Sequence, residues 1–304
     1  MNILVTGGKG AVGKPLAGEL EKRGHRVWVA DRIHSHETQY IRCDVSEFHQ
    51  VERTLTQEKL DCVYHLAAEF GRRNGEDFYE NLWKSNAIGT KNIIRMQERL
   101  KFRLVFFSSS EVYGDYRGVM YEDVMDKVAI KQMNDYAMTK WVNEMQILNS
   151  AARFGTETVR VRLFNTYGPG EYYSEYRSAI CVFIYKALHN LPYTVYTEHE
   201  RTSSYIDDSV RTLANIVEKF KPGEVYNIAG TELHNMKTAS DIILKYLGKD
   251  DSLVEYRKSQ ADTTLVKKVD ASKAARDLGH KSTVTLEEGI PRTIEWQKEV
   301  YGRG

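Results

Sequence analysis

Short apolar runs alternate with amphipathic stretches along the first half of the chain. The strand-sized runs lie at residues 3–6, 26–30, 40–45, 62–68, 104–110 and 158–164. The stretches between them carry apolar residues at helical spacing, and strands that alternate with helices form parallel sheets. The pattern therefore predicts an α/β fold with a doubly wound parallel sheet.

Two long helices are predicted at residues 77–99 and 136–153. Each carries more apolar surface than one face of a sheet can bury, so a partner is needed for the rest. We expect these helices to pair with their copies in a homodimer. The segment 69–77, which is polar and carries charges of both signs, is expected to be a loop over the site.

The periodic units become shorter after Asn165-Thr-Tyr-Gly-Pro-Gly170, and residues 201–208 are expected to be a polar link. We predict a first domain over residues 1–168 and a smaller lobe over 169–304. The run at 224–230 has the composition of one more sheet strand. The first domain is therefore expected to receive a later contribution near residues 203–230.

A glycine-rich turn follows the first strand directly. Gly7, Gly10 and Gly13 have the spacing GxxGxxG and lead into a helical stretch. Glycines permit a close approach of the backbone to a ligand, and the N–H groups at a helix N-terminus bind phosphate. A turn of the same composition can also join strand and helix without any ligand, but its position after the first strand predicts a dinucleotide site.

Asp31 ends the second predicted strand, where a carboxylate binds the ribose hydroxyls of a dinucleotide and repels a 2′-phosphate. This favours NAD over NADP, although the neighbouring Arg32 could bind that phosphate. Asp44 is placed either to meet the adenine or to cap the helix that starts near Ser46. His65 lies inside an apolar run and is interpreted as a core histidine.

Candidate chemistry gathers at the end of the fifth strand. There Ser108-Ser-Ser-Glu111 follows an apolar run, and Tyr136 and Lys140 share a helix face at i, i+4 spacing. A lysine ammonium and the positive ring of oxidised nicotinamide both favour phenolate, so Tyr136 could act as a general base. Ser109 would hydrogen-bond the same substrate hydroxyl. A Tyr and a Lys four apart are more often a solvated helix face, so this interpretation depends on the rest of the chain.

Composition narrows the classes of protein. The 43 basic and 42 acidic residues give a net charge of +1, without a global field that would attract nucleic acid or an anionic membrane. Three distant cysteines without CxxC spacing indicate a reducing compartment and no zinc site. No signal peptide or membrane span is evident, so we expect a cytoplasmic protein that uses no metal.

Several motifs together resemble the extended short-chain dehydrogenase/reductases, and within them the nucleotide-sugar epimerases, dehydratases and decarboxylases. They are TGGKGAVG at 6–13, HLAA at 65–68, NAIGTKN at 86–92, SSSEVYGD at 108–115, YAMTK at 136–140 and RLFNTYGPG at 162–170. The similarity continues to LEEGIPRTIEW at 286–296. It implies a Rossmann-like NAD domain, a C-terminal substrate lobe, and oxidation of a nucleotide sugar at C4.

The resemblance also implies roles for individual residues. The catalytic set is Ser109, Glu111, Tyr136 and Lys140. The substrate set is Ser109, Ser110, Asn165, Arg201 and Lys268, with Asn165 and Arg201 at the diphosphate. The cofactor set is Gly7, Gly10, Ala11, Val12, Gly13, Asp31, Arg32, Asp44, Val45, Leu66, Ala67, Ala68, Asn86, Tyr136 and Lys140. Two positions depart from the family, because Ser203 replaces a usual aromatic residue and Lys268 a frequent arginine.

Glu111 bears on the reaction. A 4,6-dehydratase needs a base for the C5 proton once C4 is a ketone, whereas a 4-epimerase has no use for that carboxylate. We therefore expect a 4,6-dehydratase, with a 4-epimerase and then a nucleotide-glucuronate decarboxylase as alternatives. In a plainer interpretation Glu111 caps a turn or pairs with Lys131 or Arg117. An inactive dinucleotide-binding regulator is the alternative of another class.

Overall fold

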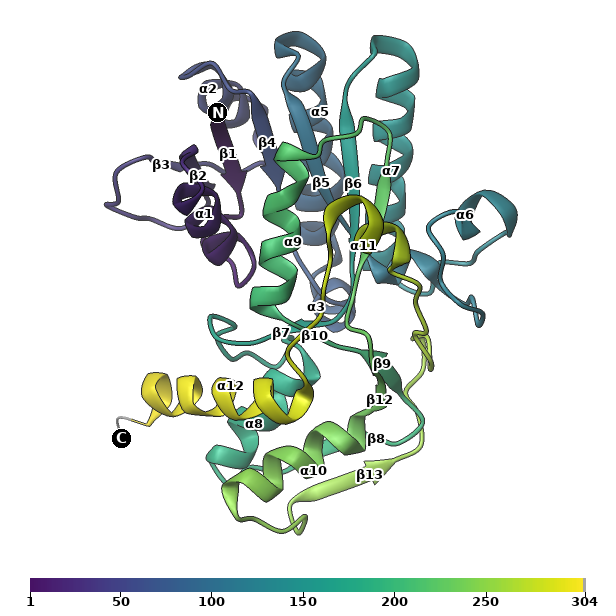
Figure 1. The fold of residues 1–304 in the computed structure, drawn as a ribbon. Helices are drawn as coiled ribbons and strands as arrows, with labels where there is room; N and C mark the ends of the chain where they lie inside the picture. The colour runs from purple at the N-terminus through teal and green to yellow at the C-terminus, as the bar shows by residue number, and fades with distance from the viewer. Residues whose placement is uncertain (303–304) are drawn as a thin grey trace.

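A seven-stranded parallel sheet forms the centre of the protein in the computed structural model, which describes residues 1–302 (Figure 1). Its order is β11-β6-β5-β4-β1-β2-β3. The strands are β1 (Asn2–Thr6), β2 (Arg26–Asp31), β3 (Tyr40–Arg42), β4 (Cys62–His65), β5 (Arg103–Ser109), β6 (Thr158–Leu163) and β11 (Val225–Ile228). The predicted doubly wound sheet is confirmed. Because the strand order reverses between β1 and β4, a crevice opens there at the carboxyl ends of the strands.

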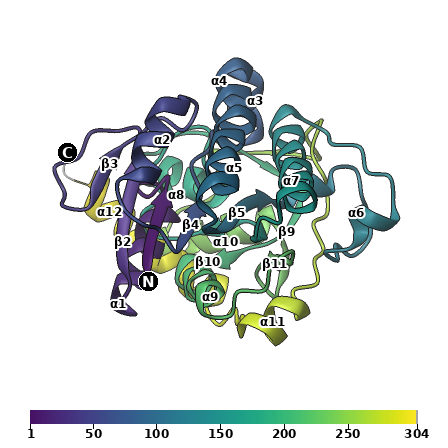
Figure 2. The ribbon, with the colours of Figure 1, turned by 90° about the horizontal axis from the view of Figure 1, so that it is seen from above.

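Helices cover both faces of this sheet (Figure 2). One layer holds α1 (Gly13–Lys22), α9 (Ile206–Glu218) and α11 (Ser272–Leu278), and the other holds α2 (Phe48–Thr56), α5 (Gly89–Leu100) and α7 (Asp135–Phe154). Alternate residues of β1 enter opposite cores, since Ile3 and Val5 pack toward α1 and Leu4 toward α2.

The helix predicted over 77–99 is confirmed except at its first two residues, because residues 79–100 are continuously helical. It consists of α4 (Tyr79–Trp83), the π-helical turn η1 (Lys84–Ile88) and α5, and it follows the short helix α3 (Arg72–Asp77). Phe78, with φ of −133° and ψ of 49°, separates α3 from α4. The prediction of a loop at 69–77 was therefore partly wrong. Only Gly75 of α3 is buried, so no apolar periodicity marks this helix in the sequence.

The second lobe surrounds its own core below the sheet (Figure 1). Its elements are α8 (Ala179–Leu188), β8 (Tyr193–Tyr196), β9 (Glu200–Thr202), β12 (Leu233–Asn235), α10 (Met236–Leu247), β13 (Val254–Arg257) and α12 (Leu286–Tyr301). Short elements complete the described chain: η2 (Ser110–Tyr113), α6 (Val124–Lys127), β7 (Thr166–Tyr167) and β10 (Ser204–Tyr205). The expected polar link at 201–208 thus contains parts of two strands and the start of α9, because its residues pair with β7 and β12.

The chain leaves the sheet once and later returns to it. After β6 the chain enters the second lobe and then returns to the sheet as β11, which pairs with β6 through Val225–Ile228. Within residues 1–302 no helix has the length and apolar character needed to cross a bilayer.

Candidate functional site

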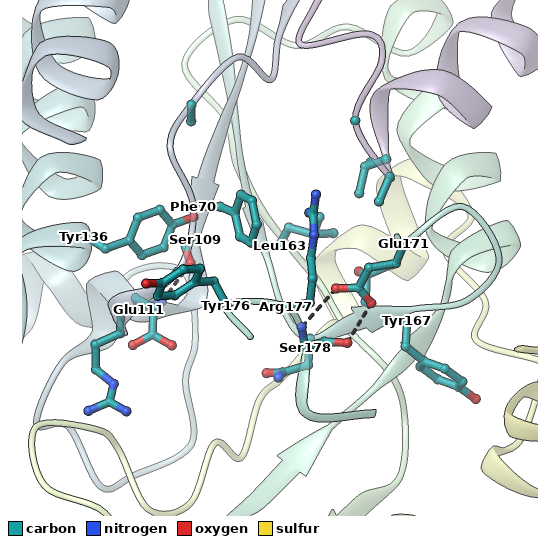
Figure 3. Close-up of a pocket in the computed structure, with 18 of the residues that line it drawn as sticks. Phe70, Ser109, Glu111, Tyr136, Leu163, Tyr167, Glu171, Tyr176, Arg177 and Ser178 are labelled. Atoms are coloured by element: carbon teal, nitrogen blue, oxygen red, sulfur yellow. Dashed lines mark hydrogen bonds between the residues drawn. The ribbon is translucent and has the colours of Figure 1, made fainter. Parts of the chain in front are cut away.

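A cavity of about 800 Å³ lies at the carboxyl ends of the strands, between the sheet and the second lobe (Figure 3). The first lobe lines it with the turn after β1, the ends of β2, β4 and β5, and one face of α7. The second lobe contributes the loop that leads into α8 and residues near β8 and β9. With the exceptions of Asn86 and Lys268, every predicted site residue lines this one cavity.

The glycine turn fits the backbone so closely that side chains are excluded. A Cβ on Gly7, which has φ of +69°, would lie 2.7 Å from the Ala67 nitrogen, and a Cβ on Gly13 would lie 2.3 Å from the Gly7 oxygen. The N-terminus of α1 has no side-chain cap and no acidic residue in its first turn. Pro15 has no N–H, and the N–H groups of Lys14 and Leu16 donate to backbone carbonyls. The N–H groups of Val12 and Gly13 are therefore those available to a phosphate.

Asp31 and Arg32 are both held in place at the end of β2. The Asp31 carboxylate accepts hydrogen bonds from the backbone N–H of Lys9 (3.0 Å) and of Arg32 (2.8 Å). The Arg32 guanidinium donates to the Glu69 carboxylate at 2.7 Å, which engages it away from a 2′-phosphate. Asp44 lines the cavity and also caps the next turn through Ser46 N–H at 2.9 Å.

Asn86 and Lys268 do not line the cavity. Asn86 is fully buried and instead fixes the main chain of Glu69, accepting from its N–H at 2.8 Å and donating to its C=O at 3.0 Å. Lys268 is exposed, and the neighbouring Lys267 is the lysine that turns inward. Lys268 does not reach the cavity as expected, because in an extended segment successive side chains point to opposite sides.

Ser109, Tyr136 and Lys140 converge at the end of β5. Tyr136 is hydrogen-bonded to Ser109. Lys140 Nζ donates to the Phe107 carbonyl at 2.8 Å and lies 5.8 Å from the centre of the Tyr136 ring. Burial raises the pKa of Tyr136 to about 12, although the Ser109 hydrogen bond opposes this. Burial also lowers the pKa of Lys140 to about 7.

A buried charge cluster fixes α7, the helix that carries Tyr136 and Lys140. Glu144, one turn after Lys140, accepts hydrogen bonds from Ser108 Oγ (2.5 Å) and from Arg162 Nε and Nη2 (3.0 and 2.9 Å). Burial opposes ionisation, but Arg162 holds the pKa of Glu144 below its usual range. Because Ser108 precedes Ser109, this cluster ties α7 to the strand end that carries the candidate catalytic serine.

Glu111 has a partner that the sequence did not reveal. Its carboxylate forms an ion pair with the buried Lys267, whose Nζ also lies 3.3 Å from Ser110 Oγ. This replaces the anticipated pairing with Lys131 or Arg117. Burial opposes ionisation of Glu111, yet Lys267 and then Arg201 keep the pKa of its carboxyl below the usual range.

The diphosphate residues expected from the resemblance also reach the cavity. Asn165 lines it directly after β6, and Arg201 lines it from β9. Arg201 is held by two backbone carbonyls, since its Nη1 donates to Glu200 (2.8 Å) and Leu265 (2.7 Å). Its guanidinium is thereby fixed beside the Glu111–Lys267 pair.

The sequence analysis did not identify the loop before α8 as part of the cavity wall. Tyr176 and Arg177 lie in the loop before α8 and meet residues 70–78 of the first lobe. This loop has neither helical nor strand periodicity, and its partners are distant in the sequence, so no local signal marked it.

Among residues 1–302 there is no group of three or more His, Cys, Asp or Glu side chains arranged to hold a metal ion.

Residues 3–229 match the NAD dependent epimerase/dehydratase family. The chain belongs to this family. Among curated proteins it is 28% identical to UDP-N-acetyl-alpha-D-glucosaminuronate decarboxylase of Bacillus cytotoxicus, over 98% of both chains. It is 25% identical to dTDP-glucose 4,6-dehydratase of Salmonella typhimurium, over 97% of this chain and 92% of the relative.

Among solved structures, UDP-glucuronic acid 4-epimerase from Bacillus cereus in complex with UDP-glucuronic acid and NAD superposes with a TM-score of 0.89 and 26% identity, covering 99% of this chain and 100% of the other. Family membership makes the protein an NAD-dependent enzyme that modifies nucleotide sugars. The observed site fits this cofactor, since the glycine turn leaves no room for side chains and the N–H groups of Val12 and Gly13, where α1 begins, have no acceptor within residues 1–302.

Proposed function

We propose that the enzyme oxidises a nucleotide uronate at C4 and releases its C6 carboxylate as carbon dioxide. The observation that carries this proposal is the Glu111–Lys267 ion pair. Lys267 neutralises the carboxylate of Glu111, and Arg201 lies close by. A substrate carboxylate can approach such a neutralised, cation-rich region without repulsion. Two of the relatives above, a decarboxylase and an epimerase, act on nucleotide uronates according to their names.

The chemistry assigns a task to each candidate residue. Tyr136 accepts the proton of the C4 hydroxyl, Ser109 orients that hydroxyl, and Lys140 on the same helix face tunes Tyr136. NAD supplies the hydride acceptor at C4. The C4 ketone makes the C6 carboxylate that of a β-keto acid, so the C5–C6 bond breaks with its electrons passing into the enolate. A proton from water is then added to C5, the hydride returns from the reduced cofactor to C4, and Tyr136 gives its proton back to the C4 oxygen.

The ion pair also changes the case for a 4,6-dehydratase. A carboxylate stabilised by an ammonium is a weaker base for the C5 proton than a free one. The dehydratase stays a second candidate because Glu111 lines the cavity beside Ser109 and because one relative is a dTDP-glucose 4,6-dehydratase. A 4-epimerase needs only Tyr136 and Ser109 for proton transfer at C4. In that reaction Glu111 would have no chemical role and would serve only to pair with Lys267.

Product masses distinguish these reactions. The full-length protein is incubated with NAD and, separately, with UDP-glucuronate, UDP-glucose and dTDP-glucose, and the nucleotide sugars are analysed by mass spectrometry. We expect UDP-glucuronate to lose carbon dioxide and give a nucleotide pentose. Loss of water from a neutral hexose would establish the dehydratase instead, and an isomer of unchanged mass would establish epimerisation.

A single substitution tests the role of Tyr136, whichever of the three reactions the enzyme carries out. Tyr136→Phe keeps the ring packed and removes the proton acceptor, so turnover should fall by roughly 10²-fold or more with little loss of fold. Normal turnover by this variant would exclude Tyr136 as the base.

A further inference from the structure

Glu69 lies at the cofactor end of the cavity, although it is not one of the residues expected to bind the cofactor. It follows Ala68 after β4 and lines the cavity. One oxygen of its carboxylate accepts a hydrogen bond from Arg32 Nη1 at 2.7 Å, and the other accepts from Asn74 Nδ2 at 3.2 Å. Both oxygens of Glu69 therefore have partners in the protein, and one of these partners is a cation.

The main chain holds Glu69 in place. Its N–H donates to Asn86 Oδ1 at 2.8 Å, and its C=O accepts from Asn86 Nδ2 at 3.0 Å. Asn86 is fully buried and also bonded to Thr139 at 3.1 Å. The side chain of Glu69 is 18% exposed, whereas that of Arg32 is 66% exposed. Glu69 is thus the more firmly held member of the pair, and it determines where the guanidinium lies.

Arg32 is the cation that a 2′-phosphate on the adenosine ribose would meet. Its N–H donates to the Asp31 carboxylate at 2.8 Å, and a carboxylate at this position binds the ribose hydroxyls of a dinucleotide. Two other cations lie nearby, Lys9 and Arg42. The Lys9 ammonium forms an ion pair with Glu37, and Arg42 Nε donates to the Arg32 carbonyl at 3.2 Å. Of the three cations, Arg32 is the one that lines the cavity.

We propose that Glu69 helps to select NAD over NADP by keeping Arg32 away from the 2′-phosphate. A guanidinium that is paired with a carboxylate must give up this pair before it can bind a phosphate. The carboxylate left behind would then repel the phosphate. NAD has a hydroxyl at this position and needs no cation there, so the pair can stay intact when NAD binds.

Glu69 complements the effect of Asp31. The carboxylate of Asp31 repels a 2′-phosphate, but a free arginine next to it could compensate for that repulsion. The pair with Glu69 removes this compensation. The inference rests on NAD as the cofactor and does not depend on which sugar the enzyme takes or which reaction follows.

The test is equilibrium binding of NAD and of NADP to the full-length protein, freed of bound nucleotide, by isothermal titration calorimetry. Glu69→Gln keeps the shape of the side chain and removes its charge. NADP should then bind about three- to tenfold more tightly, a modest gain because exposed ion pairs are weak. NAD affinity should stay within about twofold of the wild type, which also shows that the variant is folded. The same variants are made in an Asp31→Asn background, where weaker repulsion brings NADP binding into the measurable range.

A double-mutant cycle shows whether Glu69 acts through Arg32. Arg32→Gln alone should change NADP affinity little, because the guanidinium is already engaged. In that background, adding Glu69→Gln should improve NADP binding by less than about twofold, since no guanidinium is left to release. Equal gains from Glu69→Gln with and without Arg32 would show direct repulsion by Glu69 and would overturn the assignment. A large loss of NADP binding in Arg32→Gln would also overturn it, because Arg32 would then already bind the 2′-phosphate.

Glu255→Gln is the matched control. It removes a carboxylate from an exposed pair with Arg257 at 2.8 Å in the second lobe, and neither residue lines the cavity. It should leave both affinities unchanged. A gain in NADP affinity equal to that of Glu69→Gln would assign the effect to net charge. Unchanged NADP affinity in Glu69→Gln, or a parallel loss of NAD affinity, would likewise contradict the role given to Glu69.

Discussion

Burial changes the protonation of the candidate catalytic residues Tyr136 and Lys140. Burial raises the pKa of the phenol to about 12 and lowers that of the ammonium to about 7, so both side chains are driven toward their neutral forms. The sequence analysis expected Lys140 and the positive ring of oxidised nicotinamide together to bring Tyr136 toward ionisation. In the cavity that effect requires a further positive charge, which the oxidised nicotinamide ring supplies.

A first prediction concerns the pH dependence of stability. In the unfolded chain Lys140 holds its proton up to pH 10.5, whereas in the folded protein it releases it near 7. Between these values the unfolded state binds more protons, so this lysine makes stability rise with pH. The stability of Lys140→Met should therefore exceed that of the wild type most below pH 7, and this difference in stability should shrink toward pH 10. Thermal melts across this range measure it. The exposed Lys245→Met gives the baseline, and a pH-independent difference would contradict the assignment.

A second prediction concerns the Glu111–Lys267 pair. Removing one member of a buried pair leaves the other charge uncompensated, which costs about 3–5 kcal/mol. The loss of stability in Lys267→Met should lie near the lower end of this range, because the Glu111 side chain is 22% exposed. The double variant Glu111→Gln/Lys267→Met should regain most of the loss. Urea unfolding measures all three variants, and strictly additive effects would show that the two groups are not coupled.

At the scale of elements, the sequence was informative where the local chemistry is unambiguous. The glycine turn, the strands and the helix carrying Tyr136 were predicted from periodicity and from residues that tolerate few alternatives. The short helix α3 before Phe78 was not, because its residues are polar and only Gly75 among them is buried. Lys267 was missed because the register of an extended segment depends on its neighbours, here Met120 and Glu200 in isolated bridges.

A third prediction tests the glycine turn with two alanine substitutions in one helix. In Gly13→Ala the new Cβ would lie 2.3 Å from the Gly7 oxygen, so the turn must open and NAD affinity should fall by tenfold or more. In Gly18→Ala no atom outside the adjoining helix backbone lies within 4 Å of the new Cβ. That variant should keep NAD affinity and gain about 0.5–1 kcal/mol of stability from helix propensity. Calorimetry and melting curves measure both, and equal behaviour of the two would refute the role given to Gly13.

At the scale of the molecule, the cavity belongs to both lobes. The sheet gives the glycine turn, the carboxylate of Asp31 and the catalytic residues, while the second lobe gives Arg177 and Arg201. Contacts of this kind join residues far apart in the chain, which explains why no local pattern indicated that Tyr176 and Arg177 would line the cavity.

A fourth prediction concerns assembly. Apolar side chains on the outer faces of η1 and α7 are exposed, among them Ile88 (53%), Met138 (40%) and Met145 (45%). Met138 and Met145 are two turns apart on one face, so a copy of the same surface could cover both. We predict a homodimer through these helices, which Met145→Glu should split. Light scattering should show the change, whereas Leu253→Glu, in the second lobe, should stay dimeric. A monomeric wild type at micromolar concentration would rule out the dimer.

The return of the chain to the sheet as β11 affects how the protein is made. On the ribosome, β6 leaves the exit tunnel well before residues 225–228, so the strand next to the catalytic β5 has an unpaired edge during that interval. Open strand edges recruit other strands, and nascent chains in this state are vulnerable to misassembly. A chain interrupted near residue 168 would keep this edge permanently, which makes the second half necessary for safe synthesis of the first.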